Sequence, residues 1–235
     1  MDNISELQSR IDQENENIQE RYKKRTDNER YEFLGKNLFF THYSLAEREL
    51  RFSQIVKKKF SSARNLKLIE VGAGAGNNLA IFKKMGFKWK DLYANELLED
   101  RFFVLKENLP SCVLHQGDAL ELNYKENFDI VFQSTVFTSV LDMEIKKMLA
   151  KKMLEMTKPG GIVLWYDFKF DNPSNKDVKG VDKNEIKSLF NFAPKIEFYA
   201  VTLAPPIGRR IGRLYSLVNF LFPFLRTHLI AVIHK

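Results

Sequence analysis

The chain has 235 residues, of which 44% are hydrophobic and 29% charged, and this is enough for one α/β domain with appended segments. Lysine and arginine exceed aspartate and glutamate by 37 − 30 = 7, but the lysines are spread along the chain, so charge alone argues against a nucleic-acid partner. The single cysteine, Cys112, excludes an intramolecular disulfide, argues against a cysteine-based metal site and predicts a reducing, cytoplasmic location. No secretory signal opens the sequence, and no apolar run approaches the roughly 18 residues of a membrane span. We therefore expect neither secretion by that route nor a membrane-spanning segment.

The first sixty residues are predicted to be largely helical. Residues 1–30 are polar with a thin apolar stripe at helical spacing, so this helix packs across the domain, pairs with a partner or frays. The stripe consists of Ile4, Leu7, Ile11, Ile18 and Tyr22. Further on, Ser44 and Glu47 have the spacing of a capping box, which predicts a second helix from about 45 to 60 with Ser44 as its N-cap.

The most informative stretch runs from Leu68 to Leu79, where an apolar run ends in three alternating glycines and a helical pattern. This order predicts a strand, a tight turn and a helix. Glycines let the backbone adopt positive φ and let a ligand approach the main chain, beside the unpaired N–H groups of a helix start. Asn77 stands where a dinucleotide fingerprint needs its last glycine, and Glu70 would repel a pyrophosphate. The turn therefore favours a ligand that carries an ammonium group.

The run Glu70-Val71-Gly72-Ala73-Gly74-Ala75-Gly76 resembles motif I, E/D-x-G-x-G-x-G, of the class I S-adenosylmethionine-dependent methyltransferases. Lys158-Pro159-Gly160-Gly161 looks like the family's turn into its fifth strand, and the resemblance covers about residues 65–170. It implies S-adenosylmethionine as the cofactor and S-adenosylhomocysteine as the product. It also implies that residues 1–60 form a helical segment over the cofactor and that residues 61–235 form the methyltransferase domain.

From residue 65 onward, apolar runs alternate with helical patterns. The predicted strands are 67–71, 91–95, 112–116, 128–133, 161–167, 196–203 and 228–234. Alternating strands and helices need crossover connections, which predicts a parallel, doubly wound sheet with helices on both faces. The last strand follows its predecessor without a crossover helix and returns antiparallel. This seven-stranded, mostly parallel α/β arrangement matches the family's Rossmann-like sheet, and its ligands lie at the carboxyl ends of the strands.

The resemblance places a cofactor site at the ends of the first four predicted strands. Glu96 ends the second strand, where a carboxylate can accept hydrogen bonds from two vicinal ribose hydroxyls. In the family, an acidic side chain and a backbone amide after the third strand bind adenine, and residues ending the fourth strand touch the methionine moiety. The residues so implied are Glu70, Gly72, Ala73, Gly74, Glu96, Leu97, Gly117, Asp118, Ala119 and Gln133.

A hydroxyl acceptor loses its proton as it takes the methyl group, so we expect a base at the same edge of the sheet. Asp167, which ends the fifth predicted strand, and His228, which begins the seventh, meet this condition and are the candidate catalytic residues. His228 is better tuned to neutral pH. Each has a structural alternative, as an acceptor-orienting carboxylate and as a hydrogen-bonded strand histidine. No metal is required, because methyl transfer is an in-line displacement.

Residues 203–225, between the last two predicted strands, are the expected specificity element. They combine Arg209, Arg210 and Arg213 with leucines and phenylalanines, which predicts a basic apolar helix. This helix is either a lid over the acceptor that packs on the domain or, over residues 207–225, an interfacial helix that rests on an anionic membrane. The second arrangement would suit a lipid-linked acceptor.

The loop after the fourth predicted strand narrows the acceptor. Enzymes that methylate adenine or glutamine amino groups carry Asn/Asp-Pro-Pro-Tyr/Phe at this position, whereas this sequence has Gln133-Ser134-Thr135-Val136. A nucleic-acid base is therefore a less expected acceptor than a hydroxyl or another small molecule. Trp165-Tyr166-Asp167-Phe168 and Arg226-Thr227-His228 also resemble a narrower group of bacterial methyltransferases associated with surface-polysaccharide gene clusters.

We therefore predict a methyltransferase that acts on a hydroxyl of a small molecule or a glycan, including a lipid-linked glycan. The alternatives are a non-catalytic binding or scaffold protein that kept the fold, and an RNA methyltransferase. A nicotinamide-dependent oxidoreductase is disfavoured by Asn77 and Glu70. Glu70, Glu96 and Asp118 together favour the enzyme over the scaffold, because a scaffold needs no set of three acids facing a cofactor. The sequence leaves the oligomeric state open.

Overall fold

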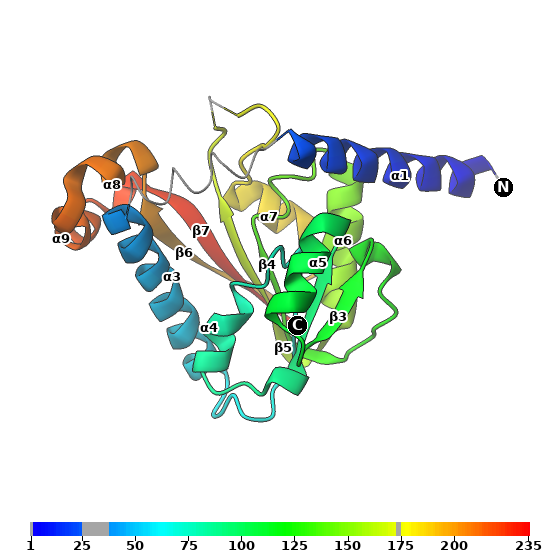
Figure 1. Cartoon of the computed structure of the whole chain (residues 1–235), viewed down its shortest axis with the longest axis horizontal. Helices are drawn as coiled ribbons and strands as arrows, with labels where there is room; N and C mark the ends of the chain where they lie inside the picture. The colour runs from blue at the N-terminus through cyan, green and yellow to red at the C-terminus, as the bar shows by residue number, and fades with distance from the viewer. Residues whose placement is uncertain (1, 25–37, 173–174) are drawn as a thin grey trace.

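The computed structural model describes residues 2–24, 38–172 and 175–235. Seven strands form one sheet in the order β3-β2-β1-β4-β5-β7-β6. Strands β1 to β5 pair in parallel, and β7 is antiparallel to both β5 and β6. The fold class predicted from the alternation, a doubly wound sheet with an antiparallel last strand, is confirmed (Figure 1).

Six of the seven strands lie within two residues of their predicted ranges. The bounds are β1 (Leu68–Val71), β2 (Leu92–Glu96), β3 (Val113–Gln116), β4 (Phe128–Ser134), β5 (Thr157–Phe168), β6 (Lys195–Leu203) and β7 (Arg226–His234). Strand β5 begins earlier than predicted, because the turn at residues 158–161 stays within the strand as an irregularity, where its register with β4 shifts.

Helices cover both faces of the sheet, as the crossover connections require (Figure 1). Phe52, Phe82 and Leu105 place α3 (Leu38–Lys59), α4 (Leu79–Lys84) and α5 (Glu99–Asn108) over one face. Leu149 and Ile186 place α6 (Met143–Met156) and α7 (Lys183–Leu189) over the other. Two short 3-10 turns, η1 (Trp89–Asp91) and η2 (Ala119–Glu121), complete the connections around β2 and β3.

Helix α1 (Asp2–Lys23) is the first predicted helix, and the remainder of the stretch predicted to be helical, residues 25–30, lies outside the described residues. Ile11 and Ile18 of its apolar stripe are buried against Val140 and Ile145. The helix therefore packs across the domain, which was one of the arrangements that the sequence left open.

The predicted start of the second helix is wrong. Helix α3 already runs from Leu38, and Ser44 lies inside it, where its hydroxyl donates to the carbonyl of Thr41 at 3.1 Å. The turn before Ser44 is held by a distant contact, since the ring of Phe40 packs on Tyr215 with centroids 6.0 Å apart. Tertiary packing thus overrides the local capping signal.

Residues 203–225 form two short helices rather than one. They are α8 (Pro205–Ile211) and α9 (Tyr215–Leu221), with the 3-10 turns η3 (Gly212–Leu214) and η4 (Pro223–Leu225) after each. Gly212 separates the helices with φ of +53°, a backbone conformation that other residues adopt only with strain. None of the described helices is both long and apolar enough to span a bilayer.

Candidate active site

A cleft of about 130 Å³ lies at the carboxyl ends of β1, β2 and β4 and is covered by α1. Five of the ten predicted cofactor residues line it: Gly72, Glu96, Leu97, Asp118 and Ala119. The others are Glu70, Ala73, Gly74, Gly117 and Gln133, and the structure places them behind or beside the lining. The predicted edge of the sheet is therefore hollowed at the predicted position.

Gly72 is a turn residue whose replacement by any larger residue would disturb the wall of the cleft. Its φ is +66°, and a Cβ built on it would lie 2.5 Å from Cγ2 of Val136, which itself lines the cleft. Two residues on, the amide of Gly74 donates to Oε2 of Glu96 at 2.6 Å, and the amide of Leu98 donates to Oε1 at 2.9 Å. Glu96 thus ties the glycine turn to the loop after β2, and each of its oxygens retains a further lone pair for a ligand.

The predicted residues outside the lining shape the cleft through hydrogen bonds. The amide of Ala73 donates to the carbonyl of Asn95 at 2.9 Å, and Nδ2 of Asn95 donates to the carbonyl of Gly117 at 2.9 Å. Oε1 of Gln133 accepts from the amide of Val136 at 3.0 Å. Asn95, which the sequence did not single out, therefore links the loops after β1 and β3.

Asp118 faces both the cleft and α1. Its Oδ1 accepts from the amide of Leu120 at 2.8 Å, and its Oδ2 accepts from Nδ2 of Asn15 at 2.8 Å. An asparagine side chain of α1 thus occupies the carboxylate that the resemblance assigns to adenine.

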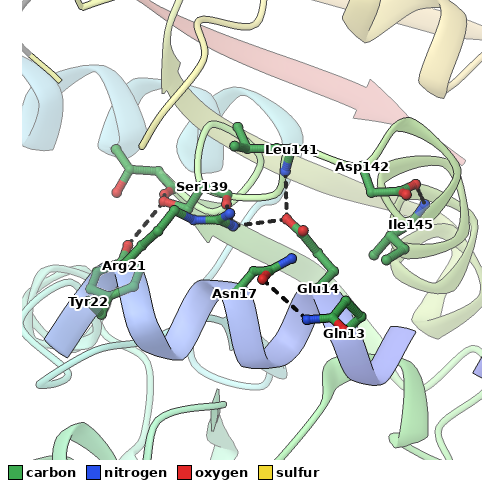
Figure 2. Close-up of polar contacts among 10 residues, drawn as sticks. Gln13, Glu14, Asn17, Arg21, Tyr22, Ser139, Leu141, Asp142 and Ile145 are labelled. Carbon is green, nitrogen blue, oxygen red and sulfur yellow. Dashed lines mark hydrogen bonds and ion pairs between the residues drawn. The ribbon is translucent and has the colours of Figure 1, made fainter. Parts of the chain in front are cut away.

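A polar network fastens α1 over the cleft, as Figure 2 shows. The carboxylate of Glu14 is nearly buried, and its Oε1 accepts from the amide of Leu141 at 2.8 Å and from Nη2 of Arg21 at 2.9 Å. Arg21 also donates to the carbonyl of Ser139 at 3.0 Å, and the hydroxyls of Tyr22 and Ser139 lie 3.0 Å apart. The cover is therefore held by specific bonds to the loop after β4, and not by apolar contact alone.

Glu70 lies on the α3 face of the sheet, fully buried, at the end of a short polar chain. Its Oε1 accepts from Nδ2 of Asn78 at 2.6 Å, and Oδ1 of Asn78 accepts from Nη2 of Arg48 at 2.9 Å. Burial raises the pKa of Glu70 to about 8, although the Asn78 hydrogen bond and the charge of Arg48 oppose the shift.

In this Glu70–Asn78–Arg48 network, two buried atoms have no hydrogen-bond partner among the residues that the structure describes, namely Oε2 of Glu70 and Nε of Arg48. One is an acceptor and the other a cationic donor, and both belong to groups bonded to the same asparagine. An α-amino acid offers an ammonium group and a carboxylate to such a pair. The residues present therefore fit the amino-acid end of S-adenosylmethionine, in which case Glu70 would meet the ammonium group and Arg48 the carboxylate.

The two candidate catalytic residues lie at the active edge but on opposite faces of the sheet. Asp167 is fully buried, and its carboxylate accepts from the amides of Thr138 at 3.4 Å and Phe168 at 3.2 Å. Burial raises the pKa of Asp167 to about 7, against the opposing effects of Thr138 and the charge of Lys146. Through Thr138, Asp167 holds the loop after β4 in place.

His228 pairs with Phe168 across β5 and β7, and its ring stacks on Tyr166 with centroids 5.3 Å apart. Burial and the nearby charge of Arg48 lower the pKa of His228 to about 4, so the imidazole is neutral at pH 7. The expectation that His228 is better tuned to neutral pH is therefore wrong, because burial moves the pKa of Asp167 to about 7 and that of His228 away from it. Nδ1 of His228 lies 3.1 Å from the hydroxyl oxygen of Thr227, and this hydroxyl donates to the carbonyl of Thr202 at 3.5 Å.

The Thr227 hydroxyl thus lies between the carbonyl of Thr202 and Nδ1 of His228, and its contact with the ring nitrogen is the shorter of the two. This contact orients the imidazole ring.

Sequence reasoning missed the residues that reach the site from other elements. They are Asn15, Tyr22, Arg48, Asn78, Asn95 and Arg101. The polar residues of α1 could have indicated this contact, because Asn15 and Glu14 interrupt the apolar stripe and bond to the loops around the cleft. Arg48 and Asn78 carried none, because their meeting depends on the packing of α3 against α4.

Comparison with known proteins agrees with the geometry. Residues 69–165, which run from β1 into β5, match a family model described as a methyltransferase domain. No curated protein matches the sequence.

Several solved structures share the fold. A SAM-dependent methyltransferase from Archaeoglobus fulgidus has 14% identity and a TM-score of 0.55, over 83% of this chain and 99% of that one. DesVI from Streptomyces venezuelae has 15% identity and a TM-score of 0.55, over 86% and 98%. An S-adenosylmethionine-dependent methyltransferase from Mesorhizobium loti has 10% identity and a TM-score of 0.56, over 77% and 96%.

At such identities these neighbours show the fold alone, whereas the matched model covers the strands that build the cleft. The cleft, the unpartnered atoms of Glu70 and Arg48, and this match lead to one conclusion. The chain carries a class I S-adenosylmethionine-dependent methyltransferase domain, and its cofactor is S-adenosylmethionine.

Proposed function

We propose that the chain transfers the methyl group to a hydroxyl of a small-molecule or glycan acceptor, including a lipid-linked glycan, with His228 as the base. The observation that carries this proposal is the neutral imidazole of His228, which stacks on the Tyr166 ring where β7 pairs with the carboxyl end of β5. S-adenosylmethionine supplies the methyl group from its sulfonium. An alcohol must lose a proton as it is methylated, and a neutral imidazole can accept that proton.

The residues around His228 have distinct tasks in the proposal. Thr227 orients the imidazole through its contact with Nδ1, and Tyr166 fixes the plane of the ring by stacking on it. Arg48 places a positive charge near the imidazole, which keeps the ring neutral and also lowers its strength as a base. Asp167 acts as a positioning residue through the amide of Thr138, since it is fully buried on the other face of the sheet.

Helix α1 is the cofactor lid of this proposal. Asn15 occupies one oxygen of Asp118, so this bond opens when Asp118 binds adenine. Ile18 and Tyr22 line the cleft and would cover the bound cofactor.

The test is a radiolabelled methyl-transfer assay against free and lipid-linked saccharides, with RNA and amines as comparison acceptors. We expect a hydroxyl product, and we expect His228→Ala to lower turnover about a hundredfold with unchanged affinity for S-adenosylmethionine. His234→Ala, on the same strand, is the matched control and keeps turnover. Transfer to RNA or to amines alone, or equal turnover in the two histidine variants, would contradict the proposal.

A further inference from the structure

The segment from α8 to η4 exposes an unusual number of large apolar side chains, together with the start of α3. This apolar corner consists of Leu38, Phe39, Leu214, Leu217, Phe220, Leu221, Phe222 and Phe224. Phe220 and Phe224 are 78% and 73% exposed. The corner lies at one end of the molecule, where α8 and α9 project beyond the sheet beside the start of α3 (Figure 1). Exposed apolar side chains gathered in this way mark an interaction site.

Hydrogen bonds and close packing hold the apolar corner against the rest of the domain. Glu47 of α3 accepts from the Tyr215 hydroxyl at 3.0 Å and from Nδ2 of Asn219 at 2.8 Å, and Nε of Arg226 donates to Oδ1 of Asn219 at 2.9 Å. A Cβ on Gly208 would lie 2.5 Å from the ring of Phe40, so α8 packs directly on α3. The polar groups of Tyr215 and Asn219 on the inward face of α9 are thus hydrogen-bonded, Val218 packs in the apolar cluster beside them, and the outward face is apolar.

The outward face of α9 differs from that of an ordinary surface helix, whose exposed face is polar. Tyr215 and Asn219 point inward, whereas Leu217, Phe220 and Leu221 are exposed at helical spacing. Leucine and phenylalanine on an exposed face, next to arginines, are typical of helices that lie in the interface of a bilayer.

The charge of the segment selects the kind of partner. Residues 203–225 contain Arg209, Arg210 and Arg213 and no acidic residue. Arg209 and Arg213 lie over the rings of Phe40 and Phe39, with their guanidinium carbons 5.8 and 5.7 Å from the ring centres. A second copy of the chain seated on the corner by two-fold symmetry would bring this positively charged segment against an identical one, and like charges repel. An anionic surface pairs with all of these arginines.

We propose that the apolar corner, from α8 to η4 with the start of α3, docks the protein on an anionic lipid bilayer. The phenylalanines and leucines enter the headgroup region, and the arginines contact lipid phosphates. The corner lies at the same edge of the sheet as His228, because Leu203 pairs with Arg226 and Val201 with His228. Where the proposed hydroxyl transfer also holds, the acceptor is an amphiphile whose polar group rises from that bilayer, and this consequence alone rests on the proposed function.

The experiment is co-sedimentation of the purified full chain with vesicles of phosphatidylcholine alone and of phosphatidylcholine mixed with phosphatidylglycerol, at low and high salt. The wild type binds the mixed vesicles, binds neutral ones more weakly and releases them as salt rises. The variants Phe220→Ser/Phe224→Ser and Arg210→Glu/Arg213→Glu each lose at least about tenfold in binding. Phe192→Ser, which changes a phenylalanine 69% exposed elsewhere, is the matched control and binds as the wild type does.

Thermal melts of all variants and light scattering of the wild type accompany the experiment. The proposal is overturned if the wild type stays in the supernatant of the anionic vesicles, or if the control loses binding as the corner variants do. It is also overturned if the wild type is a dimer without vesicle binding and Phe220→Ser/Phe224→Ser makes it a monomer. Failure of methyl transfer to saccharides would leave the docking surface standing, because no outcome here depends on activity.

Discussion

The two halves of the sheet differ in what builds their function. In the half from β3 to β4, the cleft is formed by turns that directly follow strands, such as the turn of Gly72 and the loop that begins at Asp118. In the half from β5 to β6, the contacts near the proposed acceptor side join residues from distant segments, such as Arg48 with Tyr166 or Glu47 with Tyr215. The first half holds the cleft for the cofactor, and the second holds the residues of the proposed acceptor side.

The difference teaches where a short sequence pattern is informative. A strand followed by a glycine turn fixes its own geometry, so its ligand can be inferred locally. A site made from α3, β5 and β7 has no such local pattern. If the comparison is right, changes in the first half should affect cofactor binding, and changes in the second should affect turnover.

The largest expected effect in the cofactor half is that of Glu96→Ala. The variant loses two hydrogen bonds to ribose and the bonds from the amides of Gly74 and Leu98. We expect the affinity for S-adenosylmethionine to fall about a hundredfold, which corresponds to about 3 kcal/mol for two bonds to a charged group. Calorimetric titration checks this. Glu99→Ala, an exposed acid three residues on, is the control, and an equal loss there would refute the assignment.

Glu70→Gln should have opposite effects on binding and on stability. Burial raises the pKa of Glu70 to about 8, so the folded protein holds its proton where the unfolded chain, near its usual value of 4.5, has lost it. The stability contributed by this protonation is fully present below pH 4.5 and is lost as pH rises through 8. Glutamine has no proton to lose, so we expect the melting temperature of the ligand-free variant to exceed that of the wild type by a margin that widens from pH 5 to 8.

Binding of an ammonium group favours the ionised form of Glu70, so the wild type should release up to one proton when it binds S-adenosylmethionine at pH 7. Titrations in buffers of different ionisation enthalpy measure this release. The variant should release none and bind roughly tenfold more weakly. Equal proton release in both proteins would show that Glu70 does not face the ammonium group.

The smallest expected effect is that of Asn15→Ala on the lid. The substitution removes one bond between α1 and Asp118, worth about 1 kcal/mol, so we expect association with S-adenosylmethionine to accelerate about fivefold. Stopped-flow fluorescence measures the rate. Asn17→Ala is the matched control, since Asn17 bonds only to Gln13 of the same helix among the described residues. A faster rate in both variants would mean that helix stability, and not the bond to Asp118, limits entry.

The sequence predicted the seven strands, their mixed direction and the edge that carries the cleft, because hydrophobic periodicity and glycine turns are local. It placed Glu96, Asp118 and Gly72 on the cleft for the same reason. It could not place Ser44 inside α3, because that helix is extended by the contact of Phe40 with Tyr215.

The sequence also could not predict that Asp167 and His228 lie on opposite faces of the sheet. The alternation of β5 and its register with β7 put them on opposite faces, and register is a property of the folded sheet. Arg48 was missed because an arginine in a helix gives no sign of the carboxylate that it will approach.

The most direct test of the account is one titration, of S-adenosylhomocysteine into the wild type and into Glu96→Ala, with NAD in parallel. The account predicts micromolar binding to the wild type at one site, a loss of about a hundredfold in the variant, and no heat from NAD. Absence of binding to the wild type, or binding that Glu96→Ala leaves unchanged, would contradict a cofactor site at the ends of β1, β2 and β4.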